Sequence, residues 1–110
     1  MSVLDLNTFN TLKESTGADF IPELIDAFIE DAYDQLEQLK TALASNDAET
    51  FRRAAHSLKS NAATFGAMEL SALARELEMM GRDKNLEAGT RLEVLREAFE
   101  KVKNQLNELR

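Results

Sequence analysis

The sequence predicts an all-α fold, an antiparallel up-down four-helix bundle with a short additional N-terminal helix. Three observations support this prediction. Apolar residues recur every three or four positions along most of the chain, nothing reads convincingly as a strand, and the breaks between helical stretches are short. With 110 residues, 44% of them apolar, the chain can form one core but not two, so we expect a single domain over residues 1–110.

The first two helices are predicted over residues 6–14 and 20–44, separated by a break at residues 16–18. Asp5 is a candidate N-cap for the first helix and Asp19 for the second, because a short carboxylate there can accept a hydrogen bond from the backbone. The second helix presents one apolar stripe, which consists of Ile21, Ile25, Phe28, Ala32, Leu36, Leu39 and Leu43.

The third and fourth helices are predicted over residues 48–65 and 67–81. Asn46 and Glu49 have the spacing of a capping-box-like pair at the start of the third helix. Gly66 is placed to end that helix in a left-handed conformation. The apolar face of the fourth helix is expected to consist of Leu70, Leu73, Ala74 and Leu77.

A polar loop over residues 82–89 precedes the fifth helix, which opens with a candidate capping box formed by Thr90 and Glu93. Its apolar positions form the narrow seam of a bundle helix, with Leu92, Leu95, Phe99, Val102, Leu106 and Leu109. A helical hairpin that dimerises into a coiled coil is the alternative architecture. The stripes of the second and third helices are too wide for such a two-stranded seam.

The composition excludes several classes of function. There is no cysteine, so disulfides, zinc–thiolate sites and thiol nucleophiles are absent, and one histidine cannot form a multi-histidine metal site. The net charge of −7 argues against general nucleic-acid binding. No stretch is long and apolar enough to span a membrane, and the N-terminus has no secretion pattern, so we expect a cytoplasmic protein.

The charges are distributed unevenly. Residues 50–68 contain no acid but include three cations, Arg52, Arg53 and Lys59. The preceding residues 20–50 contain one base and eight acids, which are Glu23, Asp26, Glu30, Asp31, Asp34, Glu37, Asp47 and Glu49. The positive region of an acidic chain therefore surrounds its only histidine, His56.

His56 is predicted to lie on the solvent-exposed face of the third helix. The apolar stripe of that helix consists of Phe51, Ala55, Leu58, Ala62 and Phe65. At about 100° per residue, His56 points roughly 140° away from the centre of this stripe. An imidazole in that position contributes nothing to the core, although a lone exposed histidine is usually an ordinary surface residue.

The neighbours of His56 suit an imidazole that carries an anion and is approached by another protein. Lys59 lies three residues later, where its ammonium group can reach a charge on the ring. Arg52 lies one turn earlier and adds positive potential, while Ser60 and Ala63 are too small to block a partner. The nearby cations favour the neutral, nucleophilic imidazole, which can accept a phosphoryl group.

The segment from Ala55 to Ser60, followed by Phe65-Gly66-Ala67 and by Leu77-Glu78, resembles the histidine-containing phosphotransfer (HPt) domain family. The shared pattern is A-H-x-L-K-G/S, with a glycine ten residues after the histidine and L-E about twenty-one residues after it. The predicted helices also fit the family's bundle, so the resemblance covers essentially the whole chain.

The resemblance implies that His56 accepts a phosphoryl group from a receiver-domain aspartate or a hybrid kinase and passes it to a response regulator. Lys59 matches the lysine that supports the phosphoryl group, and Gly66 the glycine that closes the helix. Ser60 stands where glycine is commonest. We expect partner docking at Arg52, Ser60, Ala63 and Gly66, a monomer, no nucleotide site, and no cofactor or metal ion of the chain's own.

Glu78 occupies the position where the family often has an acid or amide beside the histidine. Its carboxylate can hold the Nδ1 proton and leave Nε2 as the nucleophile, or it can be an ordinary solvated residue. Arg52 can likewise serve docking or pair with acids of the second helix. The apolar residues Phe20, Leu24 and Leu12, which lie off the main stripes, either form a docking patch or hold the first helix down.

Two other functions compete with the phosphorelay carrier. One is a non-catalytic helical adaptor that binds through the acidic second helix. The other is the phosphoacceptor domain of a chemotaxis-type kinase, which the run from Arg53 to Ser57 and the later run from Ala63 to Gly66 also resemble. In that case an ATP-using kinase domain is the donor. The chain could be free-standing or part of a hybrid kinase, although its opening methionine favours the free-standing form.

Overall fold

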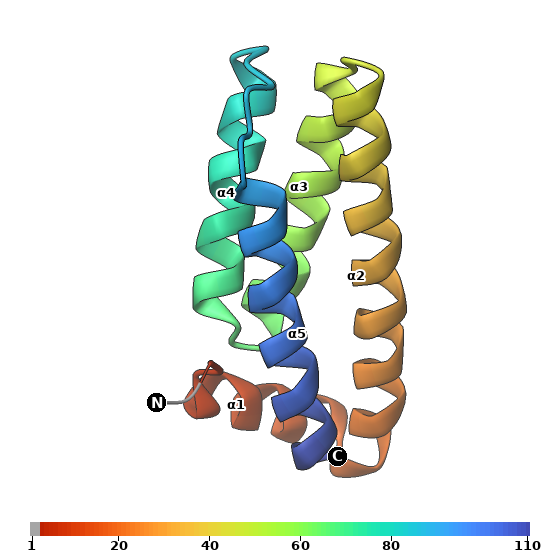
Figure 1. The fold of residues 1–110 in the computed structure, drawn as a ribbon. Coiled ribbons are helices and arrows are strands. Elements are labelled where there is room, and N and C mark those ends of the chain that lie inside the picture. Colours follow the sequence, from red (N-terminus) through yellow and green to blue (C-terminus); the bar gives the residue numbers. More distant parts are fainter. Residues whose placement is uncertain (1–2) are drawn as a thin grey trace.

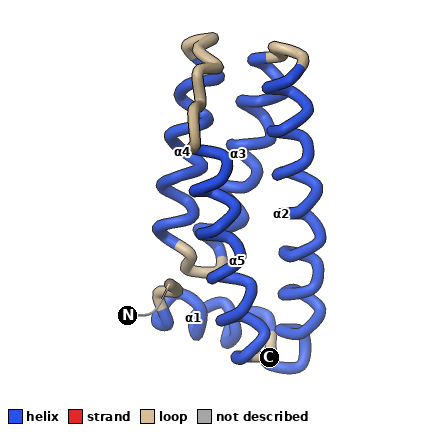
Figure 2. The backbone as a smooth tube through the Cα atoms, in the orientation of Figure 1, coloured by secondary structure: helices blue, strands red, loops and turns tan. Residues whose placement is uncertain are grey.

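The computed structural model describes residues 3–110, in which helices are joined by loops and turns and no strand is present (Figure 2). The all-α prediction is therefore confirmed. Within the described residues, no helix is both long and apolar enough to cross a membrane. The elements, in chain order, are α1 (Leu6–Thr16), the 3-10 turn η1 (Ala18–Phe20), α2 (Ile21–Ala44), α3 (Ala48–Thr64), α4 (Met68–Arg82) and α5 (Arg91–Leu109).

The four helices α2 to α5 lie alongside one another and alternate in direction, while α1 lies across the end of the molecule where α3 ends and α4 begins (Figure 1). The described residues have an elongated shape, with extents of 41 × 25 × 19 Å. Short turns join α2 to α3 and α3 to α4, and a longer loop leads to α5.

The predicted apolar stripes meet in one buried cluster. The ring of Phe28 in α2 lies 4.9 Å from that of Phe65 and 6.1 Å from that of Phe99 in α5, measured between centroids. All five stripe residues of the third helix are buried. Each large side chain buried in this way contributes about 1.5–3 kcal/mol. At the margins of the stripes, Leu43, Leu73 and Leu92 are partly buried and still pack against the core. The prediction is wrong for Leu109, which is exposed, and it missed Ala42 and Ala54, which are buried.

Two predicted helix starts have different outcomes. Asp5 is confirmed as the N-cap of α1, because its Oδ1 accepts a hydrogen bond from the Asn7 amide at 3.0 Å. Asp19 does not cap α2. It lies inside η1, and Phe20 is the residue that precedes α2, without a side-chain cap. The predicted cap, Asp19, and the predicted first residue, Phe20, belong to this short 3-10 turn instead.

The caps predicted for α3 and α5 are also wrong. Asp47, not Asn46, caps α3, since its carboxylate accepts from the amide of Thr50 at 3.1 Å and from its hydroxyl at 2.7 Å. Asn46 instead adopts a left-handed φ of 56° just after α2, a conformation that asparagine tolerates. Thr90 makes no side-chain cap for α5, so the predicted capping box is not formed.

Gly66 ends α3 as predicted, with a left-handed φ of 85°. Its carbonyl accepts a hydrogen bond from the Asp5 amide at 2.8 Å. A Cβ atom at this position would lie only 2.6 Å from the Asp5 carbonyl oxygen. The glycine therefore lets the segment before α1 pack directly on the end of the helix that carries His56.

Candidate functional site

His56 lies on the outer face of α3, where its side chain is 54% exposed, as predicted. The exposure follows from the phase of the helix, because Ala55 and Leu58 on either side of it are buried. The imidazole is therefore accessible from solvent while its backbone is fixed by the core.

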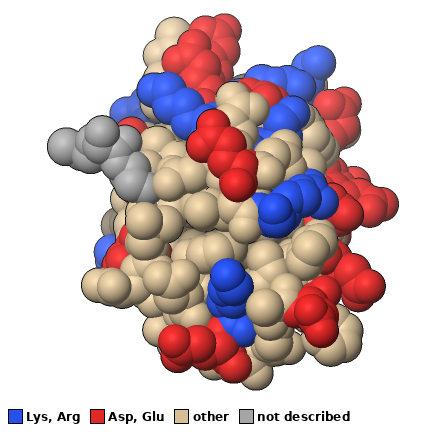
Figure 3. Space-filling view, turned by 90° about the horizontal axis from the view of Figure 1, so that it is seen from below, with Lys and Arg blue, Asp and Glu red and all other residues tan. Residues whose placement is uncertain are grey.

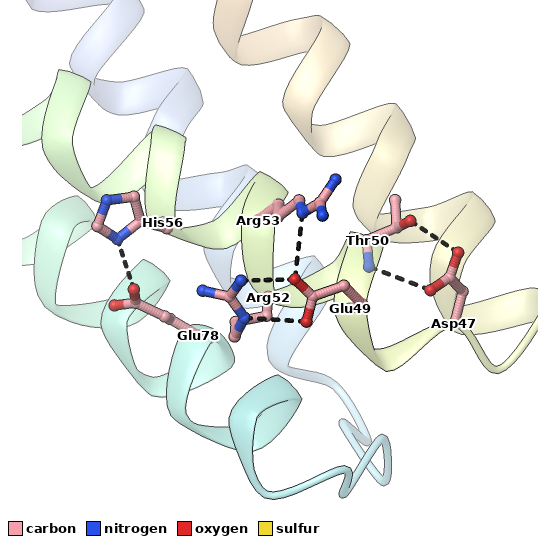
Figure 4. Close-up of polar contacts among 7 residues, drawn as sticks. All are labelled: Asp47, Glu49, Thr50, Arg52, Arg53, His56 and Glu78. Carbon is pink, nitrogen blue, oxygen red and sulfur yellow. Dashed lines mark hydrogen bonds and ion pairs between the residues drawn. The ribbon is translucent and has the colours of Figure 1, made fainter.

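The His56 ring contacts Glu78, which α4 presents from across the helix interface (Figure 4). His56 Nδ1 lies 2.5 Å from Glu78 Oε2. The Glu78 side chain is only 7% exposed, so it is not the solvated helix residue that was the alternative. A carboxylate can be buried in this way only when charged or hydrogen-bonding partners compensate for the lost water.

Lys59 supplies the second partner of the same carboxylate. Its Nζ donates to Glu78 Oε1 at 2.6 Å, so each oxygen of Glu78 contacts a different nitrogen of α3. Burial alone raises the pKa of the Glu78 carboxyl, but hydrogen bonds from Lys59 and His56 outweigh it and bring the pKa below its usual value. Glu78 is therefore an anion at neutral pH.

The contact with an ionised Glu78 determines how the neutral His56 ring is protonated. A carboxylate can only accept hydrogen bonds, so Nδ1 must carry the ring proton. Nε2 then has a free lone pair, and Figure 4 shows this second nitrogen directed away from Glu78. The arrangement can present a nucleophilic nitrogen on the surface of the helix.

Arg52 pairs within its own helix, not with α2. Its Nη2 and Nε donate to the two oxygens of Glu49 at 2.6 and 3.2 Å, and Arg53 Nε donates to the same carboxylate at 3.1 Å (Figure 4). The expected alternative of a pairing with acids of α2 is therefore wrong. All these groups are partly or fully exposed, and such surface pairs contribute little to stability.

The structure separates the expected docking residues into two kinds. Ser60 is exposed and Ala63 is partly exposed, on the same side of α3 as His56. Gly66 is buried where Asp5 packs on the end of α3, so it presents little surface of its own, and its place in the expected docking set stays a prediction. Phe20 is 58% exposed, whereas Leu12 and Leu24 pack against the core.

A groove of about 440 Å³ continues from this side of α3 toward α1. Its lining is uncharged and consists of Asn7, Thr8, Thr11, Leu12, Ser15, Ala63 and Thr64. Viewed from the end of the molecule that carries α1, uncharged side chains cover a broad area between acidic and basic ones (Figure 3). Within residues 3–110, no group of three or more histidine and carboxylate side chains is arranged to hold a metal ion.

Two α4 residues near the site were missed by the sequence reasoning. Ser71 Oγ donates to the Lys59 carbonyl at 3.0 Å, and Gly81 is buried against the backbone of Arg52. Gly81 was interpreted only as a helix end, yet α4 continues to Arg82. The available signal was a glycine three residues after Glu78, at helical spacing on the same face.

Comparison with known proteins agrees with this geometry. The model of the Hpt domain family matches residues 23–110. The chain belongs to the Hpt domain family. The crystal structure of histidine-containing phosphotransfer protein B (HptB) from Pseudomonas aeruginosa PAO1 is similar to this Hpt domain with a TM-score of 0.90 and 30% identity, covering 96% of this chain and 91% of that one.

Two curated relatives place the Hpt domain in signalling. It is 31% identical to the phosphorelay protein LuxU of Vibrio vulnificus (strain YJ016) over 83 residues, which are 76% of this chain and 72% of that protein. It is 35% identical to the sensor protein TorS of Escherichia coli (strain K12) over 75 residues, which are 68% of this chain and 8% of that protein. The function class is histidine phosphotransfer in a multistep phosphorelay, and such carriers are transfer intermediates, not kinases.

Proposed function

We propose that His56 is the phosphoacceptor of this Hpt domain, that Nε2 is its nucleophilic atom, and that receiver-domain aspartates are its donor and acceptor. The observation that carries the proposal is the 2.5 Å contact between the His56 Nδ1 and a buried, ionised Glu78. This contact supports a single neutral tautomer whose free lone pair is on the exposed nitrogen.

The transfer step follows from this tautomer. The Nε2 lone pair attacks the phosphorus of the receiver's aspartyl phosphate, an N–P bond forms, and the P–O bond breaks with the electron pair remaining on the departing carboxylate. The Nδ1 proton stays in place, so the ring of the phosphorylated His56 carries a positive charge. The negative charge of Glu78 stabilises that ring, and transfer to the next aspartate reverses the same changes.

Lys59 is proposed to stabilise the phosphoryl group. The transferred group brings close to two negative charges to a side chain that lies one helical turn from the Lys59 ammonium. Lys59 is 28% exposed and held at Glu78 Oε1, so it is already ordered on the His56 side of α3. Ordering the cation beforehand reduces the rearrangement that the transition state requires.

The docking surface is proposed to extend from His56 over Ser60 to the uncharged groove at Ala63. His56 and Ala63 are seven residues apart, which puts them on one face of α3 about 10 Å apart along the axis. A receiver can therefore cover the groove and the imidazole together. Arg52 is included because its exposed pairing with Glu49 is weak enough for an acidic partner to displace.

The proposal includes a monomeric protein in the cytoplasm, with residues 1–110 forming one domain on an antiparallel four-helix bundle and α1 as an additional helix. One exposed imidazole with both charged partners on the same chain needs no second copy. The carrier also needs no nucleotide site of its own, because its donor already holds a transferable phosphoryl group.

The experiment is phosphotransfer from a panel of radiolabelled, phosphorylated receiver domains. We expect label that is stable in alkali and labile in acid, as phosphohistidine is, in the unmodified protein and in the matched control Ser57→Ala. The His56→Gln protein, checked for its helical fold, is expected to take up none. Label on His56→Gln would refute the assignment, and label that only an ATP-using kinase domain can supply would favour the chemotaxis-type alternative.

A further inference from the structure

Gly81 is a buried glycine in the last turn of α4, one residue before the helix ends at Arg82. It does not have the left-handed φ that the other three glycines of the chain adopt, so its conformation does not require the absence of a side chain. The reason for a glycine here must lie in the space around it.

That space is occupied by the backbone of α3. A Cβ atom on Gly81 would lie 2.9 Å from the N, Cα and Cβ atoms of Arg52. Such a separation is well inside ordinary van der Waals contact, and backbone atoms cannot rotate away as the end of a side chain can. Any side chain at position 81 therefore requires α4 to move away from α3.

The close approach lies next to the proposed reaction site. Arg52 precedes His56 by one helical turn, and Gly81 follows Glu78 by almost one turn. On the other side of the site, the Ser71 hydroxyl donates to the Lys59 carbonyl at 3.0 Å. The carboxylate that bridges His56 and Lys59 thus lies between two direct contacts of α3 with α4.

We propose that Gly81 is a positioning residue: by allowing α4 to approach α3, it brings the Glu78 carboxylate within hydrogen-bond distance of His56 and Lys59. The Glu78 side chain makes contacts of 2.5 and 2.6 Å, and moving α4 away from α3 changes both the lengths and the angles of these contacts, on which their strength depends. The inference rests on the proposed function only where phosphoryl transfer is the quantity measured.

The test is Gly81→Ala with two measurements. The first is the ¹⁵N chemical shifts of the His56 ring at neutral pH, which report the fraction of rings that carry the proton on Nδ1. The second is the initial rate of phosphoryl transfer from a phosphorylated receiver domain. We expect protons to shift from Nδ1 toward Nε2 and the rate to fall about 5- to 10-fold, as for a small misplacement of a reacting group.

The control is Val102→Ala. It loosens the core from the side of α5 and changes none of the residues that contact Gly81 or Glu78 in the α3–α4 interface. It is expected to melt at a lower temperature with His56 ring shifts like those of the unmodified protein. A folded Gly81→Ala protein whose His56 ring shifts match those of the parent protein would overturn the inference. So would a Val102→Ala protein whose ring shifts change as much as those of Gly81→Ala.

If Gly81→Ala does not fold, Ser71→Ala replaces it, because removing a hydroxyl creates no clash. We expect the His56 ring shifts to move in the same direction by a smaller amount, and unchanged shifts would overturn the inference. The ring shifts do not depend on phosphorylation. If His56 were not the phosphoacceptor, no transfer to His56 would be measured, but the His56 ring shifts would still test the role of Gly81.

Discussion

Two interhelical clusters in this molecule have similar components but different geometry. Between α3 and α4, Lys59 and His56 share the carboxylate of Glu78. Between α2 and α5, the hydroxyl of Tyr33 donates to Glu100 Oε1 at 3.1 Å and accepts from Lys103 Nζ at 2.6 Å. Each cluster thus combines a lysine, a glutamate and an aromatic ring that carries a polar atom.

The difference lies in which group is central. In the α3–α4 cluster the central group is a carboxylate that is 7% exposed, and the ring at its edge has a second nitrogen without a partner in the cluster. In the α2–α5 cluster the central group is the Tyr33 hydroxyl, which donates its hydrogen to Glu100 and accepts a hydrogen bond from Lys103, and Glu100 is 39% exposed. The first arrangement leaves an atom for chemistry, whereas the second only joins two helices.

The two lysines offer the strongest way to test this contrast. We expect Lys59→Ala to lower the phosphoryl-transfer rate by about 10- to 100-fold, because the transferred group loses a cation that is only partly screened by water. The matched change Lys103→Ala is expected to leave the rate unchanged. Its cation is held by the Tyr33 hydroxyl and by Glu100, which together raise the pKa of Lys103.

The measurement is the initial transfer rate from a phosphorylated receiver at saturating and at limiting concentration. A loss for Lys59→Ala that disappears at saturation would assign this lysine to docking and contradict the proposed role at the phosphoryl group. An equal loss in Lys103→Ala would remove the functional distinction between the two clusters.

The charge of the buried Glu78 should be visible in how stability depends on pH. The pKa of Glu78 is lower in the folded protein, so its ionised form contributes stability above the usual glutamate pKa of about 4.3, and this contribution is lost as the pH falls through the folded-state pKa. We expect Glu78→Gln to reduce the free energy of unfolding by on the order of 1 kcal/mol at pH 7.

The check is denaturant unfolding of both proteins from pH 7 down to pH 3. The two unfolding free energies should converge as the pH falls through the lowered folded-state pKa of Glu78, because the unmodified side chain is then itself protonated. Curves that remain parallel throughout would mean that charge at this position does not contribute, and that the contact with His56 is a consequence of packing alone.

The exposure of His56 and its proximity to Lys59 could be predicted because both depend on one helix. The stripe from Phe51 to Phe65 determines the phase of α3, and the phase determines which residues point outward. The same local pattern predicted most of the core. It failed at the helix ends, where Asp47 and Asn46 are adjacent polar residues with similar capping tendency and only the backbone path selects between them.

The partner of His56 could not be settled in the same way. Glu78 is twenty-two residues away on another helix, and periodicity does not say which turn of α4 faces which turn of α3. That alignment depends on close contacts such as Gly81 against Arg52, where the absence of a side chain lets the two helices approach each other. The family resemblance gave the position of Glu78, and the structure adds the burial that excludes a solvated residue.

Tyr33→Phe, which removes the central atom of the α2–α5 cluster, is expected to affect stability and not phosphoryl transfer. The ring still packs against Phe99, whose centroid is 5.1 Å away, so we expect a loss of only about 0.5–1.5 kcal/mol in unfolding free energy. The transfer rate should not change, because the α2–α5 cluster shares no residue with the one around His56. Thermal unfolding and transfer kinetics on the same sample provide the comparison.

A slower transfer in this variant would mean that the α2–α5 contact helps to order the α3–α4 site through the core. The two clusters would then have to be treated as one coupled network.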